Sequence, residues 1–340
     1  MVAGWKDAMS LAGGMSTRKL LNAAKVLGSY HRSRVTGKAV ISGLPISLSI
    51  EPTTSCNLRC PECPSGLRSF TRPTGMLETH VFNKILDEVG PALAYLIFYF
   101  QGEPYLHPLF LDMVREASSR GIYTATSTNA HYLDEKNAEK TVASGLNRLI
   151  ISIDGVSQEA YEQYRVGGKI EKVLEGTRNV LKARKSLRMS TPQVVFQFLA
   201  VRPNEHEIQP LHVLAKQMGV DKVVIKTAQI YDYEHGSDLI PKNEKLSRYQ
   251  RNPDGTYSIK NDLLNHCWKM WHSCVMTWDG KILPCCFDKD GTHVMGDVSR
   301  EDFRSIWTGQ SYQRFRTALL KSRKEIEICR NCSEGTRVWA

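Results

Sequence analysis

The sequence lacks any long apolar run, and this absence argues against a membrane-spanning chain. No stretch approaches the roughly 20 apolar residues that a helix needs to cross a bilayer, and the first residues lack the apolar core of a secretory signal. Internal repeats and low-complexity segments are also missing. What remains is a composition of 41% hydrophobic and 24% charged residues, which is ordinary for a globular protein. A chain of 340 residues can bury one large domain with a smaller appendage.

Acidic residues are scarce near the N-terminus, and this scarcity contributes to the net charge of +10. Residues 1–38 contain a single acid, Asp7, with leucines and alanines interspersed among the basic residues. These basic residues are Lys6, Arg18, Lys19, Lys25, Arg32, Arg34 and Lys38. The pattern predicts a basic amphipathic helix. Such a helix could bind an anionic partner, whether lipid, nucleic acid or an acidic protein, or it could be a solvated helix packed outside the main domain.

The nine cysteines do not indicate disulfides, because they cluster in short hooks along the chain. Clusters of this kind are typical of metal binding. Free thiols and metal clusters survive in a reducing compartment, so we expect a cytoplasmic location.

One hook carries three cysteines, Cys56, Cys60 and Cys63, at a C-x3-C-x2-C spacing just after the apolar run Ile46 to Ile50. Soft thiolates select iron–sulfur clusters, zinc or Cu(I) over hard cations. A structural zinc site usually takes four ligands in paired hooks. Three thiolates can instead hold three irons of a cubane and leave the fourth iron open for a small molecule, so the motif favours an open iron–sulfur cluster.

Predicted strands and helices alternate along the middle of the chain. Strands are expected at 46–51, 95–100, 123–128, 148–153, 193–201 and 222–226, with helices near 79–88, 109–119, 134–143, 158–185 and 207–218. Six such alternations predict parallel strands joined by right-handed crossovers, which makes the fold class α/β. Periodicity alone does not separate an open sheet from a barrel.

The three-cysteine hook is the signature of the radical S-adenosylmethionine (radical SAM) enzymes, and the chain resembles that family. The resemblance implies a [4Fe–4S] cluster on Cys56, Cys60 and Cys63, with SAM bound to the fourth iron. It also implies an external one-electron donor such as flavodoxin or ferredoxin. Reductive cleavage of SAM would give a 5′-deoxyadenosyl radical that abstracts hydrogen from the substrate. The fold implied is a partial (β/α)6 barrel with its functional loops after the carboxyl ends of the strands.

Three further stretches resemble the segments with which this family holds SAM. Gly102 and Glu103 follow the second predicted strand and resemble a G-G-E segment, with Gln101 in place of the first glycine. Ser152 resembles the serine of an S-x-D-G stretch, and Arg165 resembles an arginine that pairs with the SAM carboxylate. Structural roles are open for two of them, because Asp154 of the S-x-D-G stretch could cap a helix and Arg165 could simply end one. Weaker candidates near SAM are Tyr99, Ser127 and Asn129.

A second cysteine set lies near the C-terminus, where Asp279-Gly280 predicts a hairpin turn and Gly280 precedes Cys285 by a four-residue gap. This spacing resembles the SPASM and Twitch extensions of radical SAM enzymes. The resemblance implies one auxiliary [4Fe–4S] cluster, with ligands Cys267, Cys285, Cys329 and Cys332. Cys274 and Cys286 are left over, and Cys274 could itself be a ligand. A zinc ribbon made from the same four residues is the alternative.

The resemblance implies a two-electron oxidation in which the auxiliary cluster accepts the second electron. Sulfatase-maturing relatives place an acid directly after the cysteine that corresponds to Cys285. Here that position is Cys286, with Asp288 nearby, and these two are weak candidates for the base. Even weaker ones are His266, His272 and Glu234. A peptide or protein modifier and a non-enzymatic redox sensor are alternatives, and the substrate cannot be read from the sequence.

These features predict four parts of the chain. Residues 1–45 form a basic helical extension, 46–227 the barrel, 228–265 a linker, and 266–340 the small SPASM/Twitch-like domain.

Overall fold

The structure is a computed structural model that describes residues 5–336 and 338. The ends of the predicted extension (1–4) and of the predicted C-terminal domain (337, 339 and 340) therefore lie outside the described residues. The chain divides into two compact units. The first comprises the chain up to Ser55, Phe70–Ala125 and the chain from Leu263 onward, and the second comprises Cys56–Ser69 and Thr126–Asp262.

In the first unit the strand order is β11-β10-β9-β1-β2-β3. The strands are β1 (Ser47–Ile50), β2 (Tyr95–Ile97), β3 (Tyr123–Thr128, which continues into the second unit), β9 (Ser273–Met276), β10 (Lys281–Leu283) and β11 (Gly296–Asp297). Strands β9, β1, β2 and β3 are parallel, whereas β10 runs antiparallel to both β9 and β11. In this register Leu48 lies between Leu96 and Cys274, and all three side chains are buried. The first barrel strand and the C-terminal cysteine region therefore share one sheet.

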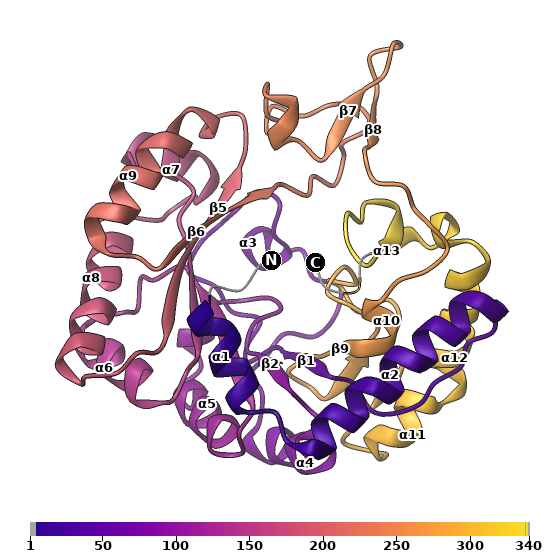
Figure 1. The fold of residues 1–340 in the computed structure, drawn as a ribbon. Helices are drawn as coiled ribbons and strands as arrows, with labels where there is room; N and C mark the ends of the chain where they lie inside the picture. Colours follow the sequence, from indigo (N-terminus) through magenta and orange to yellow (C-terminus); the bar gives the residue numbers. More distant parts are fainter. Residues whose placement is uncertain (1–4, 337, 339–340) are drawn as a thin grey trace. The chain divides into compact units, whose positions relative to one another are not determined.

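Helices of the first unit cover this sheet (Figure 1). They are α1 (Trp5–Gly13), α2 (Thr17–Thr36), α4 (Thr79–Val89), α5 (Phe110–Ser119), α10 (Lys269–His272), α11 (Phe303–Thr308), α12 (Gln310–Lys321) and α13 (Glu327–Arg330), with short 3-10 turns η1 (Pro104–Leu106) and η4 (Arg323–Glu325). The apolar residues of α4 recur at helical spacing, and Phe82, Ile85 and Leu86 are buried. Phe98 packs between Phe82 and Phe110, with ring centroids 6.0 and 5.9 Å away.

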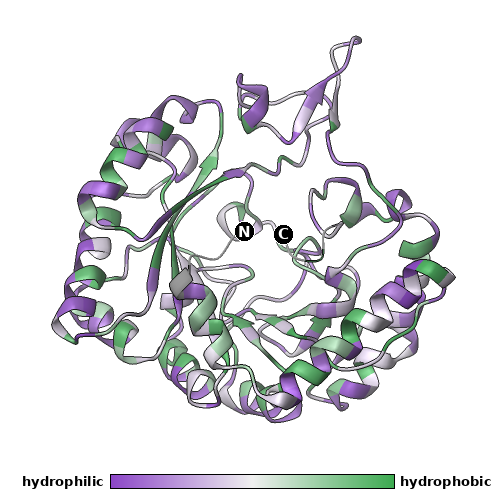
Figure 2. Ribbon diagram, in the orientation of Figure 1, coloured by the Kyte–Doolittle hydropathy of each residue, from purple (hydrophilic) through white to green (hydrophobic). Residues whose placement is uncertain are grey.

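The second unit contains the parallel strands β4 (Arg148–Ser152), β5 (Gln193–Ala200) and β6 (Lys222–Thr227). Its helices are α3 (Pro64–Leu67), α6 (Glu135–Ala143), α7 (Gln158–Tyr164), α8 (Ile170–Ser186) and α9 (Ile208–Met218), with the 3-10 turn η2 (Glu205–Glu207). Figure 1 shows α6 to α9 on the outer side of β5 and β6, and Figure 2 shows apolar and polar stripes alternating along these helices. One stripe of each helix is therefore available to the sheet and the other to solvent.

Residues 228–262, predicted as a linker, contain short ordered elements. A 3-10 turn η3 (Glu244–Leu246) precedes an antiparallel hairpin of β7 (Tyr249–Arg251) and β8 (Tyr257–Ile259). Tyr249 stacks on Tyr233 with centroids 4.6 Å apart, and its hydroxyl accepts from Ile230 N (2.8 Å). The sequence shows little periodicity here because each strand spans only three residues.

The six predicted barrel strands are all present, and the helices between them lie where the alternation predicts. Two details differ. The second strand ends at Ile97 rather than Phe100, and the helical material predicted from Gln158 to Lys185 is broken into α7 and α8. Gly167 lies in that break with φ of +81°, a conformation that favours glycine. Within the described residues, no helix has the length and apolarity needed to span a membrane.

Candidate functional site

The three-cysteine loop leads directly into the short helix α3 (Pro64–Leu67). Cys63 is the N-cap of α3, and its amide donates to the Cys60 carbonyl (3.3 Å). A Cβ at Gly66 would lie 2.5 Å from Cys60 N, so only glycine permits this close approach. The local sequence thus fixes the backbone of Cys60 and Cys63 against the start of α3.

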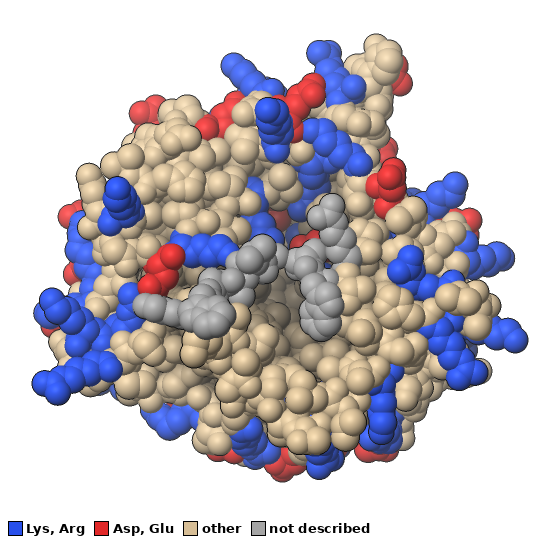
Figure 3. Space-filling view, viewed as in Figure 1, with Lys and Arg blue, Asp and Glu red and all other residues tan. Residues whose placement is uncertain are grey.

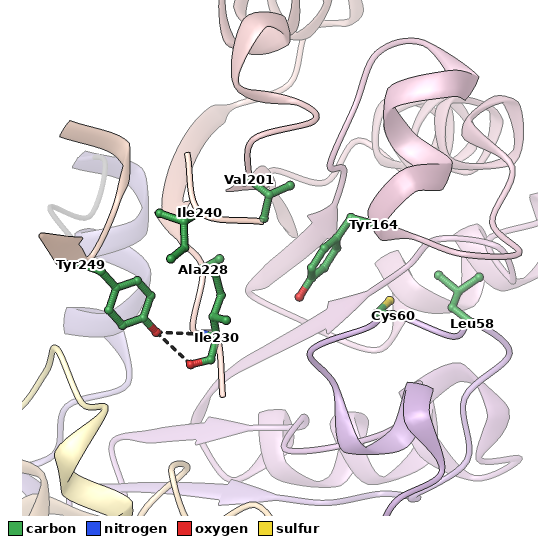
Figure 4. Close-up of a cluster of buried hydrophobic side chains, with 8 residues drawn as sticks. All are labelled: Leu58, Cys60, Tyr164, Val201, Ala228, Ile230, Ile240 and Tyr249. Atoms are coloured by element: carbon green, nitrogen blue, oxygen red, sulfur yellow. Dashed lines mark hydrogen bonds between the residues drawn. The ribbon is translucent and has the colours of Figure 1, made fainter. Parts of the chain in front are cut away.

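One side of this loop is embedded in apolar side chains of the second unit (Figure 4). The buried cluster comprises Leu58, Cys60, Tyr164, Val201, Ala228, Ile230, Ile240 and Tyr249, with Cys56 and Cys63 packed against it. Burial raises the pKa of the Cys60 thiol. The segment 228–262 therefore has a definite position: it shields the loop from water, and the amide of Tyr231 donates to the Glu62 carboxylate (3.0 Å).

A buried ion pair lies beside this loop. Arg165 Nε donates to Asp154 Oδ2 (2.5 Å), and Arg165 Nη1 lies 3.7 Å from Cys60 Sγ. The Asp154 side chain is 0% exposed and also accepts from Leu199 N (2.6 Å). Burial lowers the pKa of Arg165, but Asp154 and Cys60 outweigh it and hold that pKa well above its usual value. A permanent positive charge therefore faces the thiol of Cys60.

The same contacts resolve two open alternatives. Asp154 does not cap a helix, because the cap of α7 is Ser157, whose side chain accepts from Ala160 N. Arg165 is indeed the residue that ends α7, and it contacts the cysteine loop as well. The predicted contact of Arg165 with SAM stays a prediction.

Ser152 and the weaker candidates Ser127 and Asn129 lie at the carboxyl ends of β4 and β3. Ser127 Oγ and Ser152 Oγ are 3.4 Å apart, and Asn129 Nδ2 donates to Asn57 Oδ1 (2.7 Å). Asn57 lies between Cys56 and Cys60, so Asn129 connects the strand end to the cysteine loop. Asn57 was not predicted as a site residue, although its position between Cys56 and Cys60 is a usable signal in the sequence.

In the first unit, Gly102 and Glu103 follow β2 in a constrained turn. Gly102 has φ of +74°, and a Cβ there would lie 2.1 Å from the Thr53 carbonyl oxygen. The Glu103 amide donates to the Ser55 carbonyl (2.8 Å), and its side chain, 2% exposed, accepts from Tyr105 N (3.2 Å). Backbone packing alone therefore requires a glycine at position 102, whatever ligand the Gly102-Glu103 segment binds.

Four C-terminal cysteines of the first unit form one electrostatic group. Cys267, Cys329 and Cys332 are buried and Cys285 is partly buried. Burial raises the pKa of all four thiols, to about 11 for Cys329 and about 12 for Cys332. Neighbouring thiols of the group raise the pKa values of Cys285, Cys329 and Cys332 further. Thiols with high pKa values release protons when a metal binds, because the thiolate is the ligand.

Arg323 lies among these thiols, and its surroundings fit an anionic cluster. The side chain is fully buried; Nη2 donates to the Glu334 carbonyl (2.7 Å) and lies 3.2 Å from Cys332 Sγ. Within the described part of the chain, Arg323 Nε is buried without an acceptor. A Cβ at Gly335 would lie 2.3 Å from Cys267 Sγ, so the backbone there closes over the thiol. A buried cation with a spare N–H donor beside four thiols suits a cluster whose sulfurs accept hydrogen bonds.

Cys274 lies apart from that group, in the core beneath α12. It is 1% exposed on β9, and its pKa is raised to about 12 by burial, with Arg316 and Tyr312 as its polar neighbours. No other cysteine of the described residues is among the causes of this shift. Its surroundings are those of a packed core residue.

The two candidate bases, Asp288 and Cys286, differ in the exposure of their side chains and in their hydrogen bonds. Asp288 is 1% exposed, and its oxygens accept from the Thr292 amide (2.8 Å), the Thr292 hydroxyl (2.9 Å) and the His293 amide (2.9 Å). Cys286 is exposed, with Lys269 Nζ 3.8 Å from its Sγ. Asp288 is thus engaged in building a turn, whereas Cys286 has an accessible thiol.

Tyr99 and the remaining weak candidates are spread over the molecule. Burial raises the pKa of Tyr99 to about 12; nearby Cys286 raises this pKa further and Lys269 lowers it. Burial lowers the pKa of His272 to about 3, so this imidazole stays neutral. His266 Nδ1 bonds the Tyr30 hydroxyl (2.9 Å), and Glu234 is exposed. Of the candidates Tyr99, His266, His272 and Glu234, all within the described part of the chain, Tyr99 is the one whose pKa is affected by Cys286. Lys269 was not predicted as a site residue, because an isolated lysine carries no signal in the sequence.

Alkylation should distinguish the two spare cysteines. With the protein folded and its clusters bound, N-ethylmaleimide should label Cys286 first and label Cys274 at least about 100-fold more slowly, because only the thiolate reacts and burial suppresses it. Peptide mass spectrometry reads out each site. After iron is removed with a chelator, Cys274 should remain protected until the protein unfolds. If iron removal exposed Cys274 to labelling together with Cys267 and Cys332, this result would indicate that Cys274 is a cluster ligand.

Comparison with known proteins agrees with this geometry. Residues 50–207 match the family model of the radical SAM superfamily, and residues 267–333 match the SPASM iron–sulfur cluster-binding domain. The tungsten-containing aldehyde ferredoxin oxidoreductase cofactor-modifying protein of Pyrococcus furiosus is 26% identical, covering 84% of this chain and 86% of the relative. The PqqA peptide cyclase of Gluconobacter oxydans is 24% identical, covering 87% and 84%. Among solved structures, Streptococcus suis SuiB bound to S-adenosylmethionine superposes with a TM-score of 0.65 at 14% identity, covering 94% of this chain and 78% of that one.

The chain belongs to the radical SAM superfamily. Within that superfamily it is an enzyme with a C-terminal SPASM domain, so it binds a [4Fe–4S] cluster together with SAM and carries an auxiliary iron–sulfur cluster. The predicted α/β fold, a partial barrel with a cysteine-rich C-terminal domain, is confirmed.

Proposed function

We propose that this enzyme abstracts hydrogen from an organic substrate and completes a two-electron oxidation of it. The observation that carries the proposal is the second cysteine group, in which neighbouring thiols raise one another's pKa values and the buried Arg323 lies 3.2 Å from Cys332 Sγ. Four thiolates occupy every iron of a cubane, so this site is suited to accept an electron rather than to bind substrate. The bound groups supply an electron to cleave SAM into methionine and a 5′-deoxyadenosyl radical, and an acceptor for the substrate's second electron.

The residues that would hold the first cluster are Cys56, Cys60 and Cys63. Around it, the apolar cluster of the second unit excludes water from one side of the loop. Arg165 compensates the negative charge that the thiolates bring, because its guanidinium is permanently charged and lies 3.7 Å from Cys60 Sγ. Gly102, Glu103, Ser152 and Arg165 are the residues proposed to contact SAM. An external one-electron donor such as flavodoxin or ferredoxin completes the system.

The residues that would hold the auxiliary cluster are Cys267, Cys285, Cys329 and Cys332. Cys286 is the proposed base that takes the substrate proton, since its thiol is exposed and Lys269 Nζ lies 3.8 Å from its Sγ. Lys269 in turn is anchored by Glu334, with Nζ 2.6 Å from the carboxylate. Asp288 is a weaker proposal because its oxygens are engaged in the turn.

Removing one auxiliary ligand tests this assignment. In Cys329→Ala, iron content should fall from about eight to about four atoms per chain, because a cubane is lost when a thiolate is missing. Uncoupled formation of 5′-deoxyadenosine under dithionite should persist, whereas substrate oxidation should fall at least about tenfold. Cys274→Ala is the matched control and should keep both the iron and the coupling. Equal loss of SAM cleavage and oxidation in Cys329→Ala, with the domain still folded, would contradict a dedicated electron acceptor.

A second candidate is modification of a peptide or protein. It is favoured by the names of the relatives, which include PqqA peptide cyclases, and by the structure of SuiB bound to its precursor peptide SuiA. Incubation of the enzyme with candidate peptides and SAM, followed by mass spectrometry of the products, separates the two candidate functions. A loss of two mass units with no new bond between residues indicates oxidation. A new bond between residues indicates cross-linking.

A further inference from the structure

The N-terminal helix α2 is held to the first unit mainly by polar side chains. Lys19 Nζ donates to the carbonyls of Gly14 (3.0 Å) and Gly121 (2.6 Å). The side chain of Asn22 makes two hydrogen bonds of 2.8 Å with the backbone of Leu44. Its Nδ2 donates to the Leu44 carbonyl, and its Oδ1 accepts from the Leu44 amide. Near the other end, the ring of Tyr30 packs on Trp268 and Trp271 with centroids 5.1 and 5.6 Å away. The helix is therefore fixed in one rotation about its axis.

That rotation leaves apolar and small residues facing outward. Leu20, Leu21, Ala24, Gly28 and Val35 recur at spacings of three, four and seven residues, so they share one face, which we call the outer crest. Leu20 is 55% exposed, Leu21 59% and Val35 88%. A Cβ placed on Gly28 would meet nothing within 4 Å, so no packing among the described residues requires glycine there. The buried face is the more polar one, which reverses the usual arrangement of a surface helix.

Cations flank the outer crest on both sides. Arg18, Lys25 and Arg32 follow one another at seven-residue spacing along one side, and Arg34 lies on the other. Helix α2 contains no acidic residue at all. Among the described residues, Arg18, Lys25 and Arg32 form no salt bridge. Their charge is therefore free to act on a partner outside the chain.

A pocket lies on the Arg18 side of the crest. Its volume is about 670 Å³, and Arg18, Lys25 and Arg304 contribute three cations to a lining that includes Leu21 and Ile41. Arg304 comes from α11, along the edge where Figure 3 shows basic side chains gathered near α2 and α12. Ser42, Gly43 and Ala92 also line the pocket, and they precede β1 and β2. The pocket is thus at the opposite end of β2 from Gly102 and Glu103 and is separate from those proposed SAM contacts.

We propose that the outer crest of α2 binds the surface of a membrane that contains anionic phospholipid, with a headgroup phosphate in the Arg18–Lys25–Arg304 pocket. A planar anionic surface meets the crest and both cationic flanks at once, whereas an acidic helix would contact only one flank. The leucines and Val35 enter the boundary between headgroups and acyl chains, and the cations meet the phosphates. A second copy of α2 is disfavoured as the occupant, because two such cationic flanks repel.

Vesicle cosedimentation with the cluster-loaded protein tests the proposal. We expect binding to vesicles of phosphatidylcholine with about one third phosphatidylglycerol, little binding to pure phosphatidylcholine, and weakening as salt rises. Each surface cation contributes about fivefold to the partition coefficient. The triple variant Arg18→Gln, Lys25→Gln, Arg32→Gln should therefore bind about 100-fold more weakly. Leu20→Ser with Leu21→Ser should also bind more weakly while keeping the salt dependence.

The matched control neutralises three exposed cations of α8 instead, as Lys172→Gln, Arg178→Gln, Lys185→Gln, and should bind like the unaltered protein. Equal weakening in this control would overturn the proposal, since net charge alone would then explain binding. So would absence of binding to anionic vesicles, or full competition by inorganic phosphate at millimolar concentration, which would indicate a site for a free anion. Binding to soluble polyglutamate that is lost in the α2 triple variant, with vesicle binding unchanged, would make the surface a docking site for an acidic protein. Circular dichroism and iron content verify that each variant is folded.

Discussion

Replacing Cys56, Cys60 and Cys63 by alanine should remove about half of the iron, leaving about four atoms per chain, and should abolish SAM cleavage entirely. The three thiols come from one short loop, and no other cysteine lies in the second unit. Substitute ligands are therefore missing from that unit, and the first cluster has no alternative means of attachment there. Iron analysis after anaerobic reconstitution and chromatography of 5′-deoxyadenosine measure the two effects.

Cys286→Ala is the control for this loss. Its thiol is exposed and is not among the proposed ligands, so the variant should keep about eight irons and cleave SAM normally in the absence of substrate. Retention of SAM cleavage in the triple variant would contradict the assignment of the loop. A fall to about four irons in Cys286→Ala would instead make that residue an auxiliary ligand.

The second large effect concerns the ion pair beneath the cysteine loop. Arg165→Ala should destabilise the cluster-free protein by about 3–5 kcal/mol, because it leaves the carboxylate of Asp154 buried without its cation. Asp154 is 0% exposed and its partner 18% exposed, so solvent does not replace the lost contact. The shift in the midpoint of urea unfolding, monitored by circular dichroism, measures the change.

Removing the stranded charge should reverse much of this loss. Arg165→Ala combined with Asp154→Asn should be more stable than Arg165→Ala alone, since the asparagine can still accept from Leu199 N. The exposed pair of Lys182 and Glu135 is the control, and Lys182→Ala should hardly move the midpoint. A similarly small effect of Arg165→Ala would show that water reaches Asp154.

Strands such as β4 and β5 could be predicted from the sequence because each is rich in buried apolar residues and is followed by a helical pattern. The pairing of β1 with β9 could not, because it joins Leu48 to Cys274 across most of the chain, and periodicity reports only neighbours in sequence. The three-residue strands of the hairpin 249–259 were missed for a related reason, since their order comes from contacts such as Tyr233 on Tyr249.

The metal-binding cysteines stood out because thiols at such short spacings are typical of metal sites. The functional residues around these cysteines could not be recognised from the sequence in the same way. Arg323 and Lys269 are ordinary basic residues in the sequence, and only the fold places one among the C-terminal thiols and the other beside Cys286. Arg165 was found through a resemblance, but its pairing with Asp154 depends on the break between α7 and α8, which the helical pattern did not reveal.

The parallel pairing of β1 with β9 has a consequence for how the protein is made. On the ribosome, β1 emerges early, but the strand that completes its outer edge lies in the last quarter of the chain. Until then the backbone of Ser47–Ile50 is an open strand edge, which invites wrong pairing and aggregation. The cysteine set of the C-terminal domain is complete only when Cys332 has been synthesised, well after β9. The edge of β1 can thus be paired before that cysteine set is complete, and a chain truncated before residue 273 should accumulate as an aggregate rather than as a smaller enzyme.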